Sequence, residues 1–203
     1  MGMTELLASG QVWRGAAVEA APAVFSTGFA ALDERLGGGW PQAGITELLL
    51  ANPGLGELEL LCPSLARLAA EGRWQLWLAP PAIPYAPALQ QRGVALACQL
   101  WVTAANSRDR LWVAEQALAS GTCSMVLAWL PEVTSGQVRR LLLAAEKGQC
   151  CGFILRPADA AGQPSQASLR LVLERNDGAL QVTIAKRRGG WPGAPIRLLA
   201  EVS

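Results

Sequence analysis

The sequence predicts an α/β protein with a mostly parallel sheet flanked by helices, an antiparallel C-terminal extension and a short N-terminal helical arm. From residue 24 onward, short apolar runs alternate with segments of helical spacing, as in a parallel sheet with crossover helices. Residues 125–130 are apolar throughout, which is typical of a strand buried on both faces. Two later apolar runs flank Asn176, Asp177 and Gly178, a turn sequence that favours a hairpin.

Two units are expected, an arm at residues 1–23 and a domain at residues 24–203. Thr4 can cap a short helix in the arm, and an Ala/Pro-rich stretch follows it. The expected strands of the domain cover residues 45–50, 74–79, 96–102, 124–130, 152–155, 169–174 and 180–185. The expected helices cover residues 58–70, 86–91, 108–119 and 136–147, with Ser107 and Ser135 at the start of the last two.

Composition indicates one globular domain and excludes several chemistries. Hydrophobic residues make up 51% of the 203 residues, charged residues 16%, and the net charge is +1, so no overall field attracts nucleic acid. The chain has no histidine and its five cysteines form no C-x-x-C pair, which removes imidazole catalysis and the common zinc motifs. Without a bilayer-length apolar run or a basic, secretory N-terminus, a cytoplasmic location is expected.

The segment after the first expected strand has the position of a phosphate-binding loop without its chemistry. A P-loop reads G-x-x-x-x-G-K-[ST], in which backbone N–H groups and the Lys hold phosphates and the hydroxyl binds Mg²⁺. The corresponding residues here are Ala51, Gly56, Glu57 and Leu58. A carboxylate repels phosphate and Leu58 offers no metal ligand. We therefore expect no catalytic residue, no cofactor and no metal at this degenerate loop.

The most specific string in the chain runs from Ser26 through Gly28, Asp33 and Gly37 to Glu47. Its structural interpretation is a capped helix, a glycine C-cap and a strand entry. It also resembles the segment before the P-loop of the RecA/KaiC superfamily, S/T-G-x-x-x-L-D-x-x-L-G-G-G-x-P-x-G-x-x-x-E. The resemblance implies a RecA-like sheet.

The resemblance also implies where catalytic groups of a RecA-like ATPase should lie. The position of the catalytic Glu falls at Pro80-Pro81, and the Walker B acid is replaced at residues 128–130 by Ala, Trp and Leu. The residue that senses the γ-phosphate falls near Arg156. Because phosphoryl transfer depends on these groups, ATP hydrolysis is not expected.

Four further segments, at residues 6–15, 80–89, 111–118 and 186–190, make the chain similar to the ImuA family. ImuA is the RecA-like, SulA-related component of the bacterial ImuA–ImuB translesion mutasome. The resemblance implies a non-hydrolysing adaptor in damage-induced, error-prone DNA synthesis. Its expected partners are ImuB, a Y-family polymerase homologue, together with RecA and, indirectly, an error-prone DnaE-type polymerase.

Candidate contacts to a partner or to single-stranded DNA lie in three segments, and each has a structural alternative. The residues are Trp13, Arg14, Tyr85, Lys186, Arg187, Arg188 and Trp191. The proline-rich loop around Tyr85 is either a stiff connection or a docking surface. The basic cluster at residues 186–188 is either a solvated strand end or a contact that caps a RecA filament. Trp40, in an expected loop, is a further interface candidate.

Two other functions compete with the adaptor. A SulA-type cell division inhibitor is predicted to share the reduced fold and to bind the tubulin-like protein FtsZ. An ATPase with unorthodox ligands would bind nucleotide and depend on Glu57.

Overall fold

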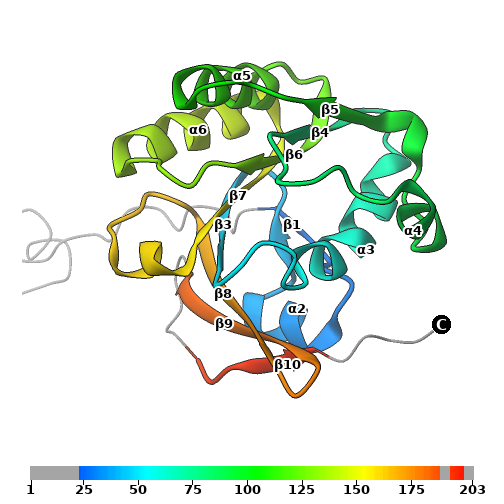
Figure 1. Ribbon diagram of the computed structural model, residues 1–203, viewed down its shortest axis with the longest axis vertical. Coiled ribbons are helices and arrows are strands. Elements are labelled where there is room, and N and C mark those ends of the chain that lie inside the picture. The colour runs from blue at the N-terminus through cyan, green and yellow to red at the C-terminus, as the bar shows by residue number, and fades with distance from the viewer. Residues whose placement is uncertain (1–22, 188–192, 199–203) are drawn as a thin grey trace, which may run out of the picture.

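The centre of the molecule is a mixed β-sheet (Figure 1). The computed structural model describes residues 23–187 and 193–198, and within them this sheet has eight strands in the order β10-β9-β8-β3-β7-β6-β4-β5. The strands are β3 (Gly44–Leu50), β4 (Trp74–Leu78), β5 (Gln99–Val102), β6 (Cys123–Trp129), β7 (Cys151–Pro157), β8 (Leu169–Asn176), β9 (Ala179–Arg187) and β10 (Ile196–Leu198). Two short strands, β1 (Val24–Phe25) and β2 (Trp40–Pro41), pair beside it.

The predicted RecA-like fold class is wrong. Strand β3 pairs in parallel with β7 and β8, but β8–β9 and β9–β10 are antiparallel. Two of the seven strand pairings in the described sheet are therefore antiparallel, and helices are few, with five α-helices among the described residues. The reason is local: after β7 the chain returns through a 3-10 helix, η2 (Ala158–Gly162), and a hairpin rather than through further crossover helices.

Helices cover both faces of the parallel half of the sheet. Helices α5 (Ser107–Ala119) and α6 (Ser135–Gly148) pack on one face with residues of β4, β6 and β7. Helices α2 (Ala30–Leu36), α3 (Glu57–Ala69) and α4 (Ala86–Gln91) pack on the other face. None of the helices within residues 23–187 and 193–198 has the length and apolarity needed to cross a membrane.

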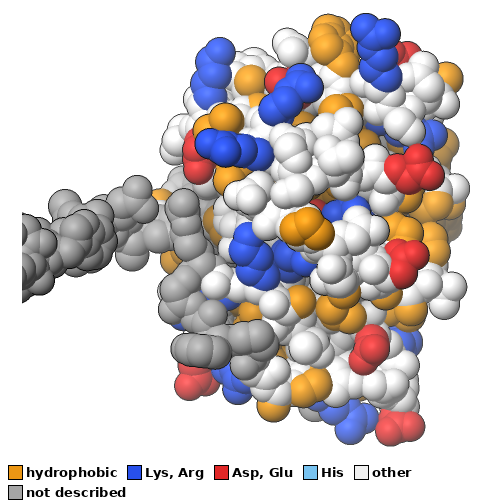
Figure 2. Space-filling model, turned by 90° about the vertical axis from the view of Figure 1, so that its left-hand side faces the viewer, with side chains coloured by type: hydrophobic (Ala, Val, Ile, Leu, Met, Phe, Trp, Pro, Cys, Tyr) orange, Lys and Arg blue, Asp and Glu red, His pale blue; other side chains and the backbone are white. Residues whose placement is uncertain are grey.

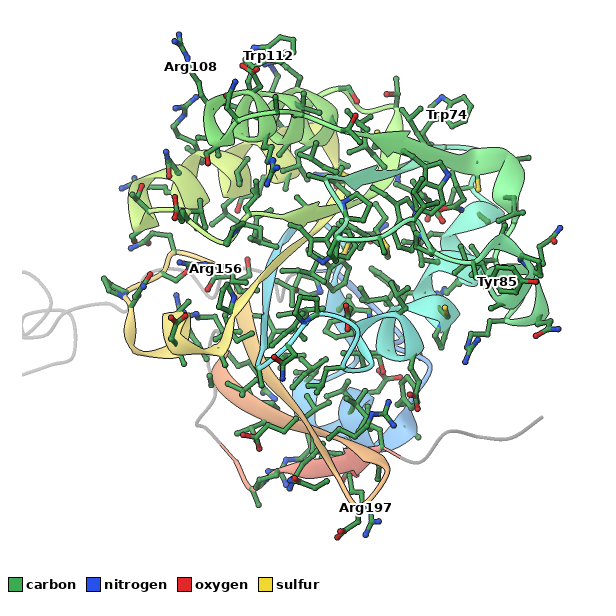
Figure 3. All side chains as sticks on the ribbon, viewed as in Figure 1. Trp74, Tyr85, Arg108, Trp112, Arg156 and Arg197 are labelled. Atoms are coloured by element: carbon green, nitrogen blue, oxygen red, sulfur yellow. The ribbon has the colours of Figure 1, made fainter. Side chains whose placement is uncertain are left out.

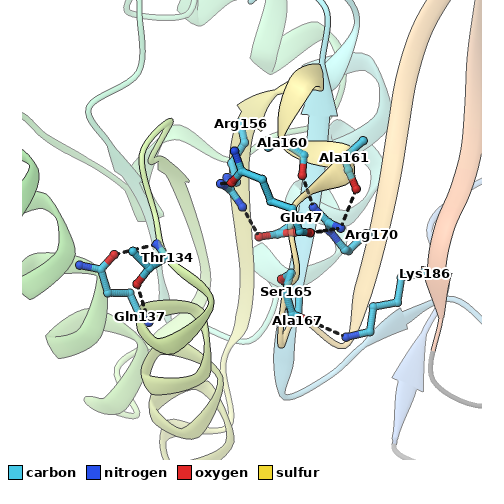
Figure 4. A network of polar contacts seen from close by, with 11 residues as sticks. Glu47, Thr134, Gln137, Arg156, Ala160, Ala161, Ser165, Ala167, Arg170 and Lys186 are labelled. Atoms are coloured by element: carbon cyan, nitrogen blue, oxygen red, sulfur yellow. Dashed lines mark hydrogen bonds and ion pairs between the residues drawn. The ribbon is translucent and has the colours of Figure 1, made fainter.

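The expected strands and helices of the domain are present, with shifts of up to three residues at their ends. The largest shift is at residues 96–98, which were expected in a strand and form a 3-10 helix before β5. Strand β3 is buried along its length, as its apolar sequence predicts. The residues that cap α5 and α6 lie one position before the expected ones. At the start of α5, the side chain of Asn106 accepts a hydrogen bond from Asp109 N. Thr134 forms a capping box with Gln137 at the start of α6 (Figure 4). Ser107 and Ser135 are the first helical residues instead.

The hairpin at Asn176, Asp177 and Gly178 is present, with Asp177 and Gly178 forming the turn between β8 and β9. Both have a positive φ, 48° and 75°, as this turn requires. Strand β10 was not predicted, because three residues after a Gly/Pro-rich segment give too little pattern to recognise a strand.

The glycine string that suggested the RecA resemblance has a structural explanation. Asp33 accepts hydrogen bonds from Ser26 Oγ at 2.5 Å and from Thr27 N at 2.7 Å. A Cβ at Gly28 would lie 2.4 Å from Pro63 Cβ, and one at Gly39 would lie 2.0 Å from the carbonyl oxygen of Phe25. These residues build a helix entry and two close backbone approaches. The predicted arm, residues 1–23, lies outside the described residues except for its last residue.

Candidate protein-binding surface and the strand-end loop

The loop at residues 51–56 connects β3 to α3, and the side chain of Glu57 closes it. Gly54 N donates to Glu57 Oε1 at 2.8 Å and Gly56 N donates to Glu57 Oε2 at 3.1 Å. Glu57 is 3% exposed and is the first residue of α3. Its carboxylate therefore occupies the position in front of these N–H groups that an external anion would take. Ala51 is exposed in the same loop, and Leu58 packs partly buried on the core.

Arg175 of β8 fixes this loop to the hairpin. Its Nε donates to the carbonyl oxygen of Leu55 at 2.9 Å, and its Nη1 donates to that of Gly178 at 2.7 Å. Its Nη2 pairs with Glu59 at 2.7 Å. Gly56 is required there, because its φ is 136° and a Cβ would lie 2.8 Å from Arg175 Nη2. The loop is thus held closed by its own protein groups.

A buried ion cluster lies beside the loop and joins three strands (Figure 4). Glu47 of β3 pairs with Arg156 of β7 at 2.9 Å and with Arg170 of β8 at 2.5 Å. The guanidinium of Arg170 also donates to the carbonyl oxygens of Ala160, Ala161 and Gln163. Arg156, expected near a γ-phosphate, is instead an ion-pair partner within the protein. A glutamate inside the apolar run of β3 was the sequence signal for such a cluster.

Of the predicted contact residues that the structure describes, Tyr85 follows β4, whereas Lys186 and Arg187 lie on β9, with four strands between β4 and β9 in the sheet order. Trp13, Arg14, Arg188 and Trp191 lie outside the described residues. Lys186 Nζ donates to the carbonyl oxygen of Ser165 at 2.8 Å, and Arg187 donates to that of Arg35. The two basic side chains of β9 are therefore engaged within the protein.

The interpretation of the tryptophans was partly wrong. Trp40, predicted as an interface residue, is fully buried and donates to Ser64 Oγ at 2.9 Å. Trp77 is buried in the core and its ring contacts those of Trp101 and Trp129, which are partly buried against the core, so all three pack as expected. Trp74, for which the sequence gave no role, is 47% exposed.

We name four exposed apolar side chains of β4, β5 and the loop after β4 the edge surface: Trp74, Ile83, Tyr85 and Leu100. Ile83 and Tyr85, in the loop between β4 and α4, are 82% and 74% exposed. Trp74 begins β4, and Leu100 lies on β5, which pairs only with β4 among the described residues. Figure 3 shows Trp74 and Tyr85 on the side of the molecule formed by β4, β5 and α4. Large exposed apolar side chains beside an open strand edge are typical of protein-binding sites.

The opposite side of the molecule has a different surface. In Figure 2, which looks at the left-hand side of Figure 1, Lys, Arg, Asp and Glu side chains are interspersed with single hydrophobic ones. That mixture is typical of a solvated surface.

A buried chain of amides holds the edge surface in place. Trp77 Nε1 donates to Gln99 Oε1 at 2.7 Å, and Gln99 Nε2 donates to Gln75 Oε1 at 2.7 Å. Gln75 Nε2 then donates to the carbonyl oxygen of Leu65 in α3 at 2.8 Å. Because all three side chains are satisfied, β5 is fixed to β4 and α3. The prolines of the following loop further limit its freedom.

No metal centre accompanies these features in the described part of the chain, and four of the five thiols are buried. Within it, no group of three or more Cys, Asp or Glu residues is placed to hold a metal. The five cysteines are free. Burial raises the pKa of the Cys62 and Cys123 thiols and that of Cys150 and Cys151 still further. These four thiols are thus kept protonated and unreactive.

These features define an α/β protein with a mixed sheet, a self-closed strand-end loop and an exposed apolar edge. The sequence model of the family described as "Cell division inhibitor SulA" matches residues 44–152. The chain belongs to the SulA family.

Relatives bear the same description. The cell division inhibitor SulA of Serratia proteamaculans (strain 568) is 37% identical over 113 residues, 56% of this chain and 67% of the relative. That of Edwardsiella piscicida is 35% identical over 131 residues, 63% of this chain and 78% of the relative. The crystal structure of SulA from Pseudomonas aeruginosa aligns with a TM-score of 0.47 and 27% identity, over 55% of this chain and 97% of that one.

The predicted ImuA identity is therefore wrong, and with it the adaptor function and the partners ImuB, RecA, DnaE-type polymerase and single-stranded DNA. Two of the segments that suggested ImuA, at residues 80–89 and 111–118, lie inside the range that matches SulA. The relatives are named for inhibition, in agreement with a protein that is not an enzyme.

Proposed function

We propose that this protein is a cell division inhibitor that acts in the cytoplasm by binding FtsZ. The observation that supports this most strongly is the family match over residues 44–152, from β3 to the start of β7. The same range contains all four residues of the edge surface.

The edge surface is the proposed contact with FtsZ. Its aromatic and branched side chains supply exposed apolar surface, and removing that surface from water favours binding. Trp and Tyr are also enriched among the residues that dominate binding energy. The prolines beside Ile83 and Tyr85 reduce the conformational entropy lost on binding. With a net charge of +1, the protein has little long-range attraction to a partner. We therefore expect affinity to depend on apolar burial more than on salt.

We assign no ATPase role to the loop at residues 51–58. Glu57 fills the space in front of Gly54 N and Gly56 N, and its charge opposes a phosphate. Leu58 provides no oxygen for a magnesium ion. Inhibition should therefore proceed without nucleotide bound to this protein.

The proposal is tested with purified FtsZ and the full chain, by sedimenting FtsZ filaments formed with GTP. The wild-type protein should reduce the pelleted fraction in proportion to its concentration. The variant Tyr85→Ala should weaken binding by about tenfold, because truncating a central aromatic contact typically costs 1–2 kcal/mol or more.

Trp112→Ala is the matched control. Trp112 is 62% exposed on α5, outside the edge surface, and its truncation should leave inhibition unchanged. Wild-type protein that leaves filament mass unaltered at stoichiometric excess contradicts the proposed function. Equal inhibition by Tyr85→Ala and Trp112→Ala contradicts the proposed surface.

A further inference from the structure

A cavity of about 460 Å³ lies at the carboxyl ends of β3, β7, β6, β4 and β5. Strand β4 leads to α4 on one face of the sheet, and its neighbour β6 leads to α6 on the other. In open α/β sheets this change of side leaves a crevice in which small ligands bind. The volume lies within the range of small-molecule sites. The cavity is separate from the edge surface, with which it shares no residue.

The walls of the cavity are apolar and carry positive charge. Prolines, leucines and the ring of Trp129 provide most of the lining, and Arg110 and Arg156 are its charged residues. No Asp or Glu is among the described residues that line it. An apolar cavity with cationic groups and no acid favours a ligand with an apolar body and a negative charge.

The two arginines are not fully neutralised by the protein. Arg156 and Arg170 share the single carboxylate of Glu47, so this buried cluster carries a surplus charge of +1. The Nε of Arg110 donates to the uncharged carbonyl oxygen of Ala104 at 2.9 Å. A buried surplus charge raises the free energy of the native state until a counter-charge approaches it.

Two residues that line the cavity also carry a buried N–H group without a protein acceptor in the described structure: Arg156 Nε and Trp129 Nε1. Nearly all buried N–H groups in native proteins are hydrogen-bonded, so two such groups in the residues of one cavity wall leave the hydrogen-bonding capacity of that wall unfilled. Ala79 also lines the cavity with a φ of 50°. For a residue other than glycine this conformation is strained, and such strain concentrates at ligand sites.

We propose that this cavity binds a small organic acid with an aromatic body, whose carboxylate faces Arg156 and Arg110 and whose ring packs on Trp129 and the prolines. A nucleoside triphosphate does not fit this chemistry. It requires several backbone N–H groups for its phosphates, and Gly54 N and Gly56 N are already bound to Glu57.

The test uses the full chain and two probes of nearly equal size, 4-phenylbutyrate and the uncharged 4-phenylbutan-1-ol. Binding is measured by calorimetry and by the shift of the thermal midpoint with probe concentration. The acid should bind at least about tenfold more tightly than the alcohol, because only the acid carries a negative charge that pairs with the arginines.

Three variants locate the site. Thr103 is exposed at the cavity, and Thr103→Trp should fill its mouth and weaken binding of the acid at least about tenfold. Ala105→Trp, two residues away and outside the lining, is the matched control and should bind like the wild type. Arg110→Gln should reduce the preference for the acid over the alcohol.

The proposal is overturned by the absence of binding at millimolar acid, by equal affinities for acid and alcohol, or by wild-type affinity in Thr103→Trp. If Thr103→Trp does not fold, unchanged acid preference in Arg110→Gln overturns it equally. Retained binding of the acid by a protein that fails to inhibit FtsZ supports the cavity while rejecting the proposed function.

Discussion

The buried end of β3 and the exposed edge at β4–β5 use charged and apolar side chains in opposite ways. Around β3 the charged residues are inside: Glu47, Arg156 and Arg170 are each at most 7% exposed in their side chains. At the edge the large apolar residues are outside, with Ile83 and Tyr85 more than 70% exposed. In a folded protein both placements are unfavourable unless something compensates them.

The compensation differs between the two regions. Most of the buried charge is compensated within the chain, by the ion pairs with Glu47 and by carbonyl oxygens that accept from Arg170. The exposed apolar side chains have no such compensation in the described structure, and the proposed contact with FtsZ would remove them from water. The polar motifs of this chain therefore build the fold, while its apolar surface residues carry the proposed function.

The largest effect on the free energy of unfolding is expected when a charge is removed from the buried cluster. Glu47→Ala leaves the two buried guanidinium groups of Arg156 and Arg170 without a carboxylate. It should lower the free energy of unfolding by about 3–5 kcal/mol, as expected when one partner of a buried ion pair is removed. Urea unfolding followed by tryptophan fluorescence measures the change.

The control for that variant is Arg140→Ala, which breaks an exposed pair with Glu115. Exposed pairs contribute little, so a change of at most about 1 kcal/mol is expected. Equal effects of the two variants would show that the cluster is not the stabilising feature described.

A smaller effect is expected at the strand-end loop. Glu57→Ala leaves Gly54 N and Gly56 N without their acceptor and should lower the free energy of unfolding by about 1–3 kcal/mol. Calorimetry with Mg-ATP should detect no binding to this variant, since Leu58 still offers no metal ligand. Micromolar affinity for Mg-ATP would mean that Glu57 alone had blocked a working nucleotide site.

The smallest effect at neutral pH is expected from the thiols. Burial raises the pKa of Cys62 and Cys123 above 9.0 in the folded state. The folded state therefore retains protons that the unfolded state loses, so stability is full below pH 9.0 and falls as the pH rises above it.

Labelling with a thiol reagent at pH 8 measures how reactive each cysteine is in the folded protein. Cys98, which is only partly buried, should react first, and the four buried thiols should react only as the protein unfolds. Rapid labelling of Cys123 in the folded protein would contradict this assignment.

Local features of the fold could be predicted from the sequence, but its pairings could not. The apolar run of β3 and the turn at Asn176, Asp177 and Gly178 act through neighbouring residues, so they were identified correctly. Glu47 and Arg156 are 109 positions apart, and only the sheet brings them together. Trp40 follows three glycines, which suggested an exposed loop, whereas the chain folds back there and buries it.

The wrong fold class and family have the same origin. The spacing of Asp33, Gly28 and Gly39 encodes a helix entry and close backbone contacts, and such local requirements are met in more than one family. The antiparallel order of β8, β9 and β10 is a property of the whole sheet. The edge surface was only partly recognised, through Tyr85, because exposure of Trp74 and Leu100 depends on which strand lies at the edge.

The most direct measurement compares FtsZ filament mass in the presence of Tyr85→Ala and Glu57→Ala, each at the same folded concentration. Tyr85→Ala should leave filaments largely intact, while Glu57→Ala should still inhibit like the wild type. If Glu57→Ala loses inhibition and Tyr85→Ala retains it, the strand-end loop rather than the apolar edge carries the function. The proposed contact between the edge surface and FtsZ is then wrong.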